Sequence, residues 1–579
     1  MLIAACATAL AGLGLLWPAL GAPASTAVGL ADGEGPAHLW GLWVAAEGLF
    51  SHGPYLRVSE VNYPAGFHAD LMDPINLLLF WPFWMLGGGG AAGAMLGWNA
   101  VHLMTVVLAG WGGWRLGRTV LQSPQAAAVT AAAVAGAPYL IGAAGVVGRS
   151  EYLPLAGWAL HLSFLIGFLR TGGRREQLGA IITLTALAHA GWQPLTWLIL
   201  AELLLVWMLY RTSSGEQTPL DRRETITRMV MVTAPAALLT LPLLLSHLST
   251  DPWWLGRLSH PSPFEERPRA VPLATLLPLI DATRSWANNP LPYLGLTLPA
   301  LAVVGVIYER KKALRWFALA SLVLIFALGE IVAMGTSVDT ATNFYYMPAA
   351  ILMHIIAPLR AFHGWARLTL LVVPLLAICA GYAIDHLTRK QPSRSLLVTA
   401  ALALLLVLEG VTWSPVGRGN FAIDTDSPAY TALAALPQGP VLELPLGMHQ
   451  QHADRALLRA QDLQRPTSLA PSPQQPSALN LSSLAWSIEQ GTDLTEHRCA
   501  ASEANRLLQA GFVGVLLHAD LLPEGETTVD AISTLLGEPT VSIDDKLAWA
   551  LDQGDSVEVP IPPSCKTLAE NGETLRLKR

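Results

Sequence analysis

Charged residues are scarce in this chain of 579 residues: Asp, Glu, Lys and Arg make up 13% of it, roughly half of the about 25% that soluble domains carry. Hydrophobic residues make up 52%, and the mean hydropathy is +0.43. This composition excludes an ordinary soluble enzyme and indicates a membrane protein. A basic surplus is missing too, because 35 Lys and Arg stand against 42 Asp and Glu. Nucleic acid, which needs a basic surface, is therefore excluded as a partner.

Long apolar runs predict the membrane-spanning part. A helix needs roughly 20 apolar residues to cross about 30 Å of hydrocarbon. Ten runs approach that length, and a shorter run at 178–190 predicts an eleventh, broken or tilted crossing. The ten are residues 2–20, 92–114, 125–147, 152–169, 195–210, 229–248, 291–308, 316–335, 368–387 and 395–413. The sequence thus predicts an α-helical polytopic membrane protein with about 11 transmembrane helices in a domain over residues 1–413.

The positions of Lys and Arg predict the orientation. Five basic clusters fall on alternate loops, and positive charge is retained on the cytoplasmic side. The clusters lie at 115–118, 170–175, 211–228, 310–315 and 389–394. This places the N-terminus inside and both the loop 21–91 and the tail outside. The apolar stretches 75–86 and 347–358 are short, so we interpret them as interfacial or re-entrant helices on the outer face.

The composition changes at Ser414, where charges become frequent and apolar runs shorten to strand length. Residues 414–579 carry 11 basic and 21 acidic side chains, a net charge of −10, which leaves +3 for the membrane part. Residues 440–446 and 513–517 are predicted strands, and 502–510 and 528–536 are predicted helices. The tail is therefore expected to be a small, soluble, extracytoplasmic α/β domain.

The chain has only four cysteines. Cys6 and Cys379 lie in predicted crossings, where they most simply pack. Cys499 and Cys565 are the two cysteines of the tail, and an oxidising outer compartment favours a disulfide between them. Two free thiols are the alternative.

The first outer segment gathers polar groups next to a membrane exit: Asp32, Glu34 and His38 lie within seven residues. A carboxylate here could deprotonate an acceptor hydroxyl or, with a neighbour, hold a divalent cation. A second interpretation is that Asp32 and Glu34 form a solvated turn that caps an interfacial helix at 38–50.

Arginine residues lie at other predicted outer turns, and a guanidinium group matches phosphate oxygens. Arg149 follows the third predicted crossing, and Arg360 and Arg367 precede the crossing at 368–387. Arg149 could instead form a plain ion pair with Glu151, and the other two could lie at the interface with their heads in water. The loop 249–290 is rich in Trp and Arg, which suits a sugar phosphate or an ordinary aromatic belt.

The order of several motifs resembles that of the glycosyltransferase-C superfamily of large bacterial membrane proteins, from about Leu2 to Trp549. The motifs are Asp32-Gly33, Tyr63-Pro64-x-Gly66, a Pro-rich interfacial segment, Tyr293-Leu294-Gly295, Arg-x6-Arg from Arg360 to Arg367, and a Gly-Pro-Val-Leu-Glu-Leu-Pro strand in the tail.

The resemblance implies a bacterial inner-membrane enzyme that moves a sugar from a polyprenyl-phosphate carrier to a lipid, glycan or protein acceptor on the outer face. In that superfamily a carboxylate of the first outer loop is the usual catalytic base, and Asp32 matches it. The pattern Asp32-x-Glu34 is similar to the metal-binding pair of the oligosaccharyltransferase branch. His38, outside that pattern, is a further candidate ligand of a divalent cation. The Trp-Trp-Asp motif of that branch is missing; only Asp251-Pro252-Trp253-Trp254 stands in the sequence. Arg360, Arg367 and Arg149 are the expected phosphate ligands.

Two other classes of function fit the same layout. One is a non-catalytic scaffold or assembly subunit that presents the acidic tail. The other is a lipid or polysaccharide transporter, although transport paths are usually marked by ionisable residues. The predicted crossings contain few such residues, with Glu202, Glu330, Asp385 and Glu409 as the candidates.

Overall fold

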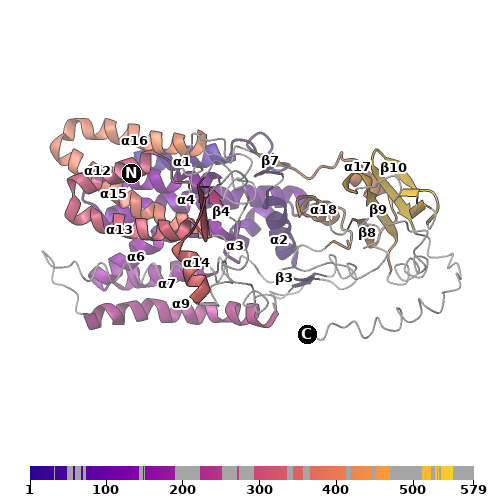
Figure 1. Ribbon diagram of the computed structural model, residues 1–579, viewed down its shortest axis with the longest axis horizontal. Helices are drawn as coiled ribbons and strands as arrows, with labels where there is room; N and C mark the ends of the chain where they lie inside the picture. Colours follow the sequence, from indigo (N-terminus) through magenta and orange to yellow (C-terminus); the bar gives the residue numbers. More distant parts are fainter. Residues whose placement is uncertain are drawn as a thin grey trace. The chain divides into compact units, whose positions relative to one another are not determined.

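The structure is a computed structural model with two compact units (Figure 1). It describes residues 1–31, 33–48, 56–58, 67–69, 74–142, 148, 150–189, 222–250, 270–272, 293–334, 343–355, 365–412, 419–445, 450–469, 511–522, 529–530, 532–533 and 536–551. The first unit comprises Met1–His38 and Asp70–Phe421, and the second comprises Leu39–Ala69 and Ala422–Arg579.

The first unit is mostly helical. Two 3-10 turns, η2 (Ser150–Gly157) and η5 (Trp365–Leu368), lead into α6 and α15. Helix α2 (Gly35–Gly48) contains the boundary between the two units. The other described helices of the first unit are α1 (Leu2–Leu16), α3 (Pro74–Leu86), α4 (Gly90–Val120), α5 (Pro124–Ala135), α6 (Trp158–Thr171), α7 (Arg174–Ala188), α9 (Arg222–Thr250), α12 (Thr297–Tyr308), α13 (Arg310–Ala327), α14 (Pro348–Ile355), α15 (Thr369–Lys390) and α16 (Pro392–Thr412).

Several helices are suited to a bilayer. In the described part of the chain, five are long and apolar enough to cross it: Gly90–Val120, Pro124–Gly142, Arg223–Pro242, Trp365–Lys390 and Pro392–Thr412. Four shorter apolar helices accompany them: Leu2–Leu16, Pro74–Leu86, Leu155–Thr171 and Thr297–Tyr308. The chain is therefore a multi-pass membrane protein. The count of eleven crossings and the inside N-terminus stay predictions.

Helix α15 forms the centre of the bundle. Every residue from Thr369 to Asp385 is buried, and the helix packs against α5, α12 and α13. Beside it, α4 and α5 meet through small residues. A Cβ atom at Gly113 would lie 2.9 Å from the Cα of Ala131, and one at Gly117 would lie 2.6 Å from the Cα of Ala127. This close approach is how helices gain contact in lipid, where burial of apolar surface between them gains little.

One predicted crossing is wrong in extent. The apolar run 316–335 predicts one helix, but α13 ends at Ala327 and Ile331–Met334 form strand β5. Gly329 has a φ of +83°, which ends the helix in a conformation that suits glycine. Strand β5 pairs in parallel with β4 (Ala270–Pro272) and antiparallel with β6 (Asn343–Tyr346). Hydropathy alone does not separate an apolar helix end from an apolar strand.

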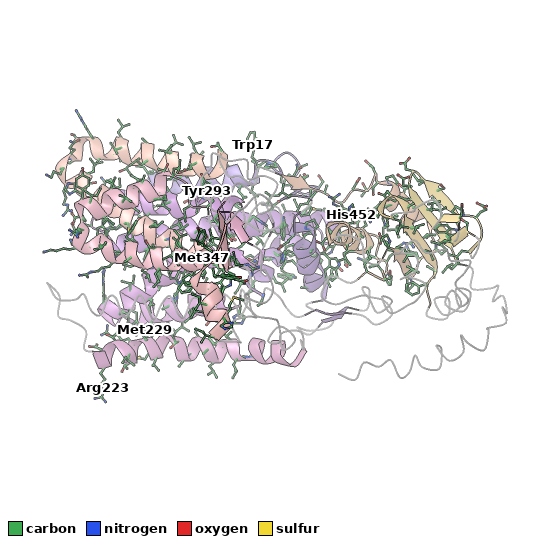
Figure 2. The ribbon with its side chains drawn as sticks, in the orientation of Figure 1. Trp17, Arg223, Met229, Tyr293, Met347 and His452 are labelled. Atoms are coloured by element: carbon green, nitrogen blue, oxygen red, sulfur yellow. The ribbon has the colours of Figure 1, made fainter. Side chains whose placement is uncertain are left out.

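The basic clusters gather at one end of the first unit. Arg170 Nη1 donates to the carbonyl of Thr119, so the end of α6 meets the end of α4. Arg228 Nη1 donates to Phe168 and Leu169, both at 2.9 Å, so the start of α9 joins them. Arg389 pairs with Glu309, which ties α15 to the turn between α12 and α13. Figure 2 shows Arg223 at the first turn of α9, pointing away from the neighbouring helices. These described contacts join the basic ends of α4, α6 and α9 to one another and the end of α15 to the turn between α12 and α13.

The second unit contains a four-stranded sheet in the order β10-β11-β9-β8. Strands β8 and β9 are parallel, and the other pairs are antiparallel. Alternate residues fill two cores: Leu442, Val515 and Trp549 belong to one, and Val441, Leu516 and Ala548 to the other. The elements are α17 (Pro428–Ala435), β8 (Val441–Leu444), α18 (Gln450–Asp462), β9 (Gly514–His518), η8 (Ala519–Leu521), β10 (Val541–Ile543), β11 (Lys546–Ala550) and a hairpin of β2 (Leu56–Val58) and β3 (Phe67–Ala69).

The strands predicted at 440–446 and 513–517 are confirmed as β8 and β9. The described residues between 529 and 536 are helical, as predicted. The predicted helix 502–510 and the pair Cys499 and Cys565 lie outside the described residues. Both remaining cysteines are free thiols, and Cys379 is buried, with its Sγ atom 3.5 Å from the carbonyl of Ala313.

Candidate functional site

The chain between α1 and α2 is held in place by two residues of α4. The Asn99 Oδ1 atom accepts from the backbone N–H of Val28 at 2.9 Å, and its Nδ2 atom donates to the carbonyls of Pro23 and Thr26 at 3.0 and 2.8 Å. The Trp98 indole N–H donates to the carbonyl of Val28 at 2.8 Å. An amide side chain whose oxygen accepts and whose nitrogen donates hydrogen bonds restrains the backbone that it contacts. The segment that leads to Asp32 is therefore anchored.

A short ladder adds a second anchor. Strand β1 (Ala27–Val28) pairs antiparallel with β7 (Asn420–Phe421), and Gly29 N–H continues the pairing to the carbonyl of Gly419 at 3.0 Å. The chain that follows α16 therefore lies beside the chain that follows α1, although about 390 residues separate them along the sequence. Sequence patterns do not reveal a two-residue ladder.

The start of α2 touches the segment that carries Arg149. A Cβ atom at Gly148 would lie 2.3 Å from the Cα of Gly35, so only glycine fits there, and Gly148 has a φ of +87°. The other side of Gly35 rests against aromatic rings: its Cβ would lie 3.0 Å from Phe421 and 3.6 Å from Trp98. The residue before Arg149 and the residue after Glu34 are thus in contact. Asp32, Arg149 and Arg360 themselves lie outside the described residues.

Glu34 and His38 form an i, i+4 pair across the first turn of α2. His38 Nε2 and Glu34 Oε2 are 3.9 Å apart, and the Glu34 side chain is 41% exposed. The helix predicted at 38–50 is confirmed as α2, which begins earlier, at Gly35, and runs to Gly48. Leu39, Leu42 and Trp43 of this helix are buried. No group of three metal-ligating side chains lies within the described ranges. Glu34 and His38 can supply two ligands, so a cation there would need further ligands from the rest of the chain.

Sequence reasoning missed one residue of this region. His102 is fully buried on α4, one helical turn beyond Trp98, and the two ring centroids are 4.6 Å apart. Its Nδ1 atom lies 2.9 Å from the carbonyl of Trp98. A single His in an apolar run is usually a packing residue. The signal that could have found it is its place about three turns into the predicted crossing 92–114, which follows the first predicted outer loop.

Arg367 lies in the 3-10 turn η5 of the first unit. It is partly buried in η5, which packs against α13 and α15. Trp365 of the same turn lies against Phe326 of α13, with ring centroids 6.3 Å apart. The described contacts thus place Gly148 against Gly35, and they place the turn that carries Arg367 against α13 and α15.

Two ionisable residues of the crossings have structural partners. Asp385 is buried on α15 and accepts from the backbone N–H groups of Gln122 and Ser123 at 2.9 and 2.8 Å, directly before α5. Glu409 on α16 accepts from Leu296 and Thr297 at the start of α12. Carboxylates at helix N-termini satisfy free N–H groups and the helix dipole. These two acids therefore stabilise helix ends.

The second unit buries a charged cluster. The Glu443 Oε1 atom of β8 accepts from His518 Nε2 at 2.8 Å and from Arg459 Nη2 at 3.0 Å. Burial by itself would raise the pKa of Glu443, but the hydrogen bonds and charges of His518 and Arg459 outweigh it and hold that pKa below its usual range. The cluster joins α18 to the adjacent strands β8 and β9.

Comparison with solved structures finds the same architecture in several membrane proteins. ArnT from Cupriavidus metallidurans in the apo state is 14% identical, with a TM-score of 0.53 over 95% of this chain and 97% of that one. The undecaprenyl phosphate complex of the same protein gives 0.50. Oligosaccharyltransferase AglB from Archaeoglobus fulgidus, in complex with an inhibitory peptide and a dolichol-phosphate, is 13% identical, with a TM-score of 0.50 over 89% of this chain and 69% of that one.

Arabinofuranosyltransferase AftD from Mycobacteria is 15% identical, with a TM-score of 0.51 over 91% of this chain and 38% of that one. The sequence matches no family model and no curated protein. AglB, ArnT and AftD belong to the glycosyltransferase-C superfamily, and this chain has the fold of that superfamily.

Proposed function

We propose that the protein is a membrane glycosyltransferase that moves a sugar from a polyprenyl-phosphate carrier to a lipid, glycan or protein acceptor on the outer face. The observation that carries the proposal is the likeness to ArnT over 95% of this chain and 97% of that one. Solved complexes of two such relatives contain undecaprenyl phosphate and dolichol-phosphate.

The proposed chemistry is an in-line displacement at the anomeric carbon. Asp32 takes the proton of the acceptor hydroxyl, whose oxygen bonds to the anomeric carbon while the bond to the carrier phosphate breaks. Arg149, Arg360 and Arg367 neutralise the phosphate that leaves. Glu34 and His38 are the proposed ligands of a divalent cation. A stable phosphate leaving group needs no strong general acid, so a single carboxylate can suffice, unlike in a glycosidase.

The contact between Gly148 and Gly35 supports two of these roles. Asp32 is three residues from Gly35 along the chain, and Arg149 directly follows Gly148. Three residues of extended chain reach about 10 Å. The proposed base and one proposed phosphate ligand are therefore both attached to the chain within that reach of the contact between Gly35 and Gly148. The anchors at Asn99 and Trp98 limit the movement of the segment that carries the base.

The proposed location is the bacterial inner membrane, with the N-terminus inside, eleven crossings and the domain 414–579 on the outer side. The shared basic end of α4, α6, α9 and α15 supports this orientation, because it places the positive charges on one face. The start of α2 would then lie toward the outer leaflet.

The test is Asp32→Asn in a strain that lacks the native copy. We expect the variant to behave like the deletion, with altered surface glycans and accumulated sugar-bearing carrier lipid, because Asn cannot accept the proton. Asp426→Asn, an exposed acid of the tail, is the matched control and should restore the wild-type pattern. Normal glycans and carrier pools with Asp32→Asn, where the deletion disturbs them, would remove the catalytic role of Asp32.

A further inference from the structure

We propose that His102 binds the sugar of the substrate: its Nε2 atom accepts a hydrogen bond from a sugar hydroxyl. The inference rests on the proposed function, because that function makes a sugar phosphate the ligand. It concerns a residue of α4, which is not part of the acidic segment that carries the proposed base.

The hydrogen bond of the other ring nitrogen sets the chemistry of Nε2. Nδ1 lies 2.9 Å from the carbonyl oxygen of Trp98. A carbonyl oxygen only accepts, so Nδ1 carries the hydrogen, and in the neutral ring Nε2 then has a lone pair. A charged ring would be costly here, because His102 is fully buried and pairs with no carboxylate in the described part of the chain.

This lone pair has no partner among the residues that the structure describes. There, Nε2 of His102 is buried and makes no hydrogen bond. Buried polar atoms are nearly always paired, and an exception needs an explanation. A bound group that donates a hydrogen bond would supply the missing partner.

The ring lies beside the first turn of α2. The start of α2 rests on Trp98, 3.6 Å from a Cβ placed at Gly35, and the centroids of the Trp98 and His102 rings are 4.6 Å apart. His38 lies in the same first turn of α2. Trp98 thus contacts both the first turn of α2, which carries the Glu34–His38 pair, and the His102 ring.

The lone pair selects which part of a sugar phosphate can bind. An ionised phosphate has only acceptor oxygens at the position facing Nε2, so the two would repel each other. Sugar hydroxyls donate as well as accept. The sugar, and not the phosphate, is therefore the group that fits His102.

The experiment compares ligands with and without a sugar. Full-length protein in lipid nanodiscs is titrated by calorimetry with short-chain polyprenyl phosphate, and with polyprenyl-phosphoryl hexoses and pentoses. His102→Phe removes the acceptor and keeps a ring, and His102→Gln keeps an acceptor oxygen. His161→Phe is the matched control, because His161 is also fully buried but lies on α6 with its Nδ1 atom 3.0 Å from Thr183 Oγ1.

We expect His102→Phe to weaken binding of the preferred sugar-bearing ligand about 3- to 10-fold, the size of one hydrogen bond. Binding of the bare polyprenyl phosphate should not change. His102→Gln should keep most of the affinity, and His161→Phe should keep all of it. Should His102→Phe not fold, His102→Leu takes its place, with folding checked by size-exclusion chromatography.

An equal loss for both ligands, or no loss for either, would overturn the role of His102 and leave the proposed function standing. A wild-type protein that binds no sugar-bearing ligand more tightly than the bare phosphate would overturn both.

Discussion

At the scale of single residues, Asp385 and Glu409 show how a membrane protein can use buried acids to bind the starts of its helices. Each accepts backbone N–H groups at the start of another helix, Asp385 before α5 and Glu409 at α12. An ionisable residue in a crossing is by default a hypothesis of function. Here the partners supply a structural reason, which weakens the main sequence argument that was available for a transporter.

Asp385→Ala should destabilise the bundle by about 3 kcal/mol, since hydrogen bonds to charged groups contribute about 1.5–3 kcal/mol each. Asp385→Asn should cost less, because its carbonyl oxygen can still accept one of the two bonds. The free energy of unfolding in detergent measures both effects. Asp424→Asn, on an exposed acid, should change nothing. A stability of Asp385→Ala equal to that of wild type would contradict the capping role.

His102 shows which properties of a single residue can be predicted from the sequence and which cannot. The residue type and its place on a helix were readable, but the unpaired Nε2 atom depends on which carbonyl Nδ1 meets and on what surrounds the ring. Asp32 and Arg149 were singled out by type and topology, and the contact between Gly148 and Gly35 that relates them comes only from packing.

At the scale of elements, run length predicted most described helices well. Runs at 92–114, 368–387 and 395–413 correspond to α4, α15 and α16. The failure at 316–335 has a physical reason: Gly329 turns the chain, and the β-branched residues Ile331 and Val332 then pair with β4 and β6. Strand partners distant in sequence are invisible to a hydropathy window.

The element pair β8 and β9 should be sensitive to acid through Glu443. Its pKa in the folded protein is below its usual value of about 4.5. The ionised carboxylate therefore stabilises the second unit above about pH 4.5, and this stabilisation is lost as the pH falls through the lower, folded-state pKa. Hydrogen–deuterium exchange of residues 441–444 and 514–518, corrected for the intrinsic rate, should show less protection at pH 4 than at pH 7.

Glu443→Gln tests the cause, because it removes the titrating group and keeps the shape. The variant should be less protected at pH 7, since Arg459 loses its charged partner, and its protection should change less between pH 7 and pH 4. An exchange pattern with the same pH dependence as wild type would assign the acid sensitivity to another group.

At the scale of the whole molecule, the orientation in the membrane is open to a direct test. The ends of α16 should lie on opposite sides. Ser393→Cys, at the basic end, should react with a membrane-impermeant maleimide only after the cells are permeabilised. Asp424→Cys, beyond the other end, should react in intact cells. The native cysteines are replaced in both variants, and the cysteine-free protein is the control. Labelling of Ser393→Cys in intact cells would reverse the orientation.

The arginines of the basic end also constrain how that orientation can be studied. Arg170 and Arg228 supply donors to the last carbonyls of α4 and α6, so their positive charge and their hydrogen bonds cannot be removed separately. Neutralising them to invert the protein would also fray two helices, and misinsertion would be indistinguishable from misfolding. Inversion is better attempted by adding lysines to the opposite loops, which leaves every helix terminus intact.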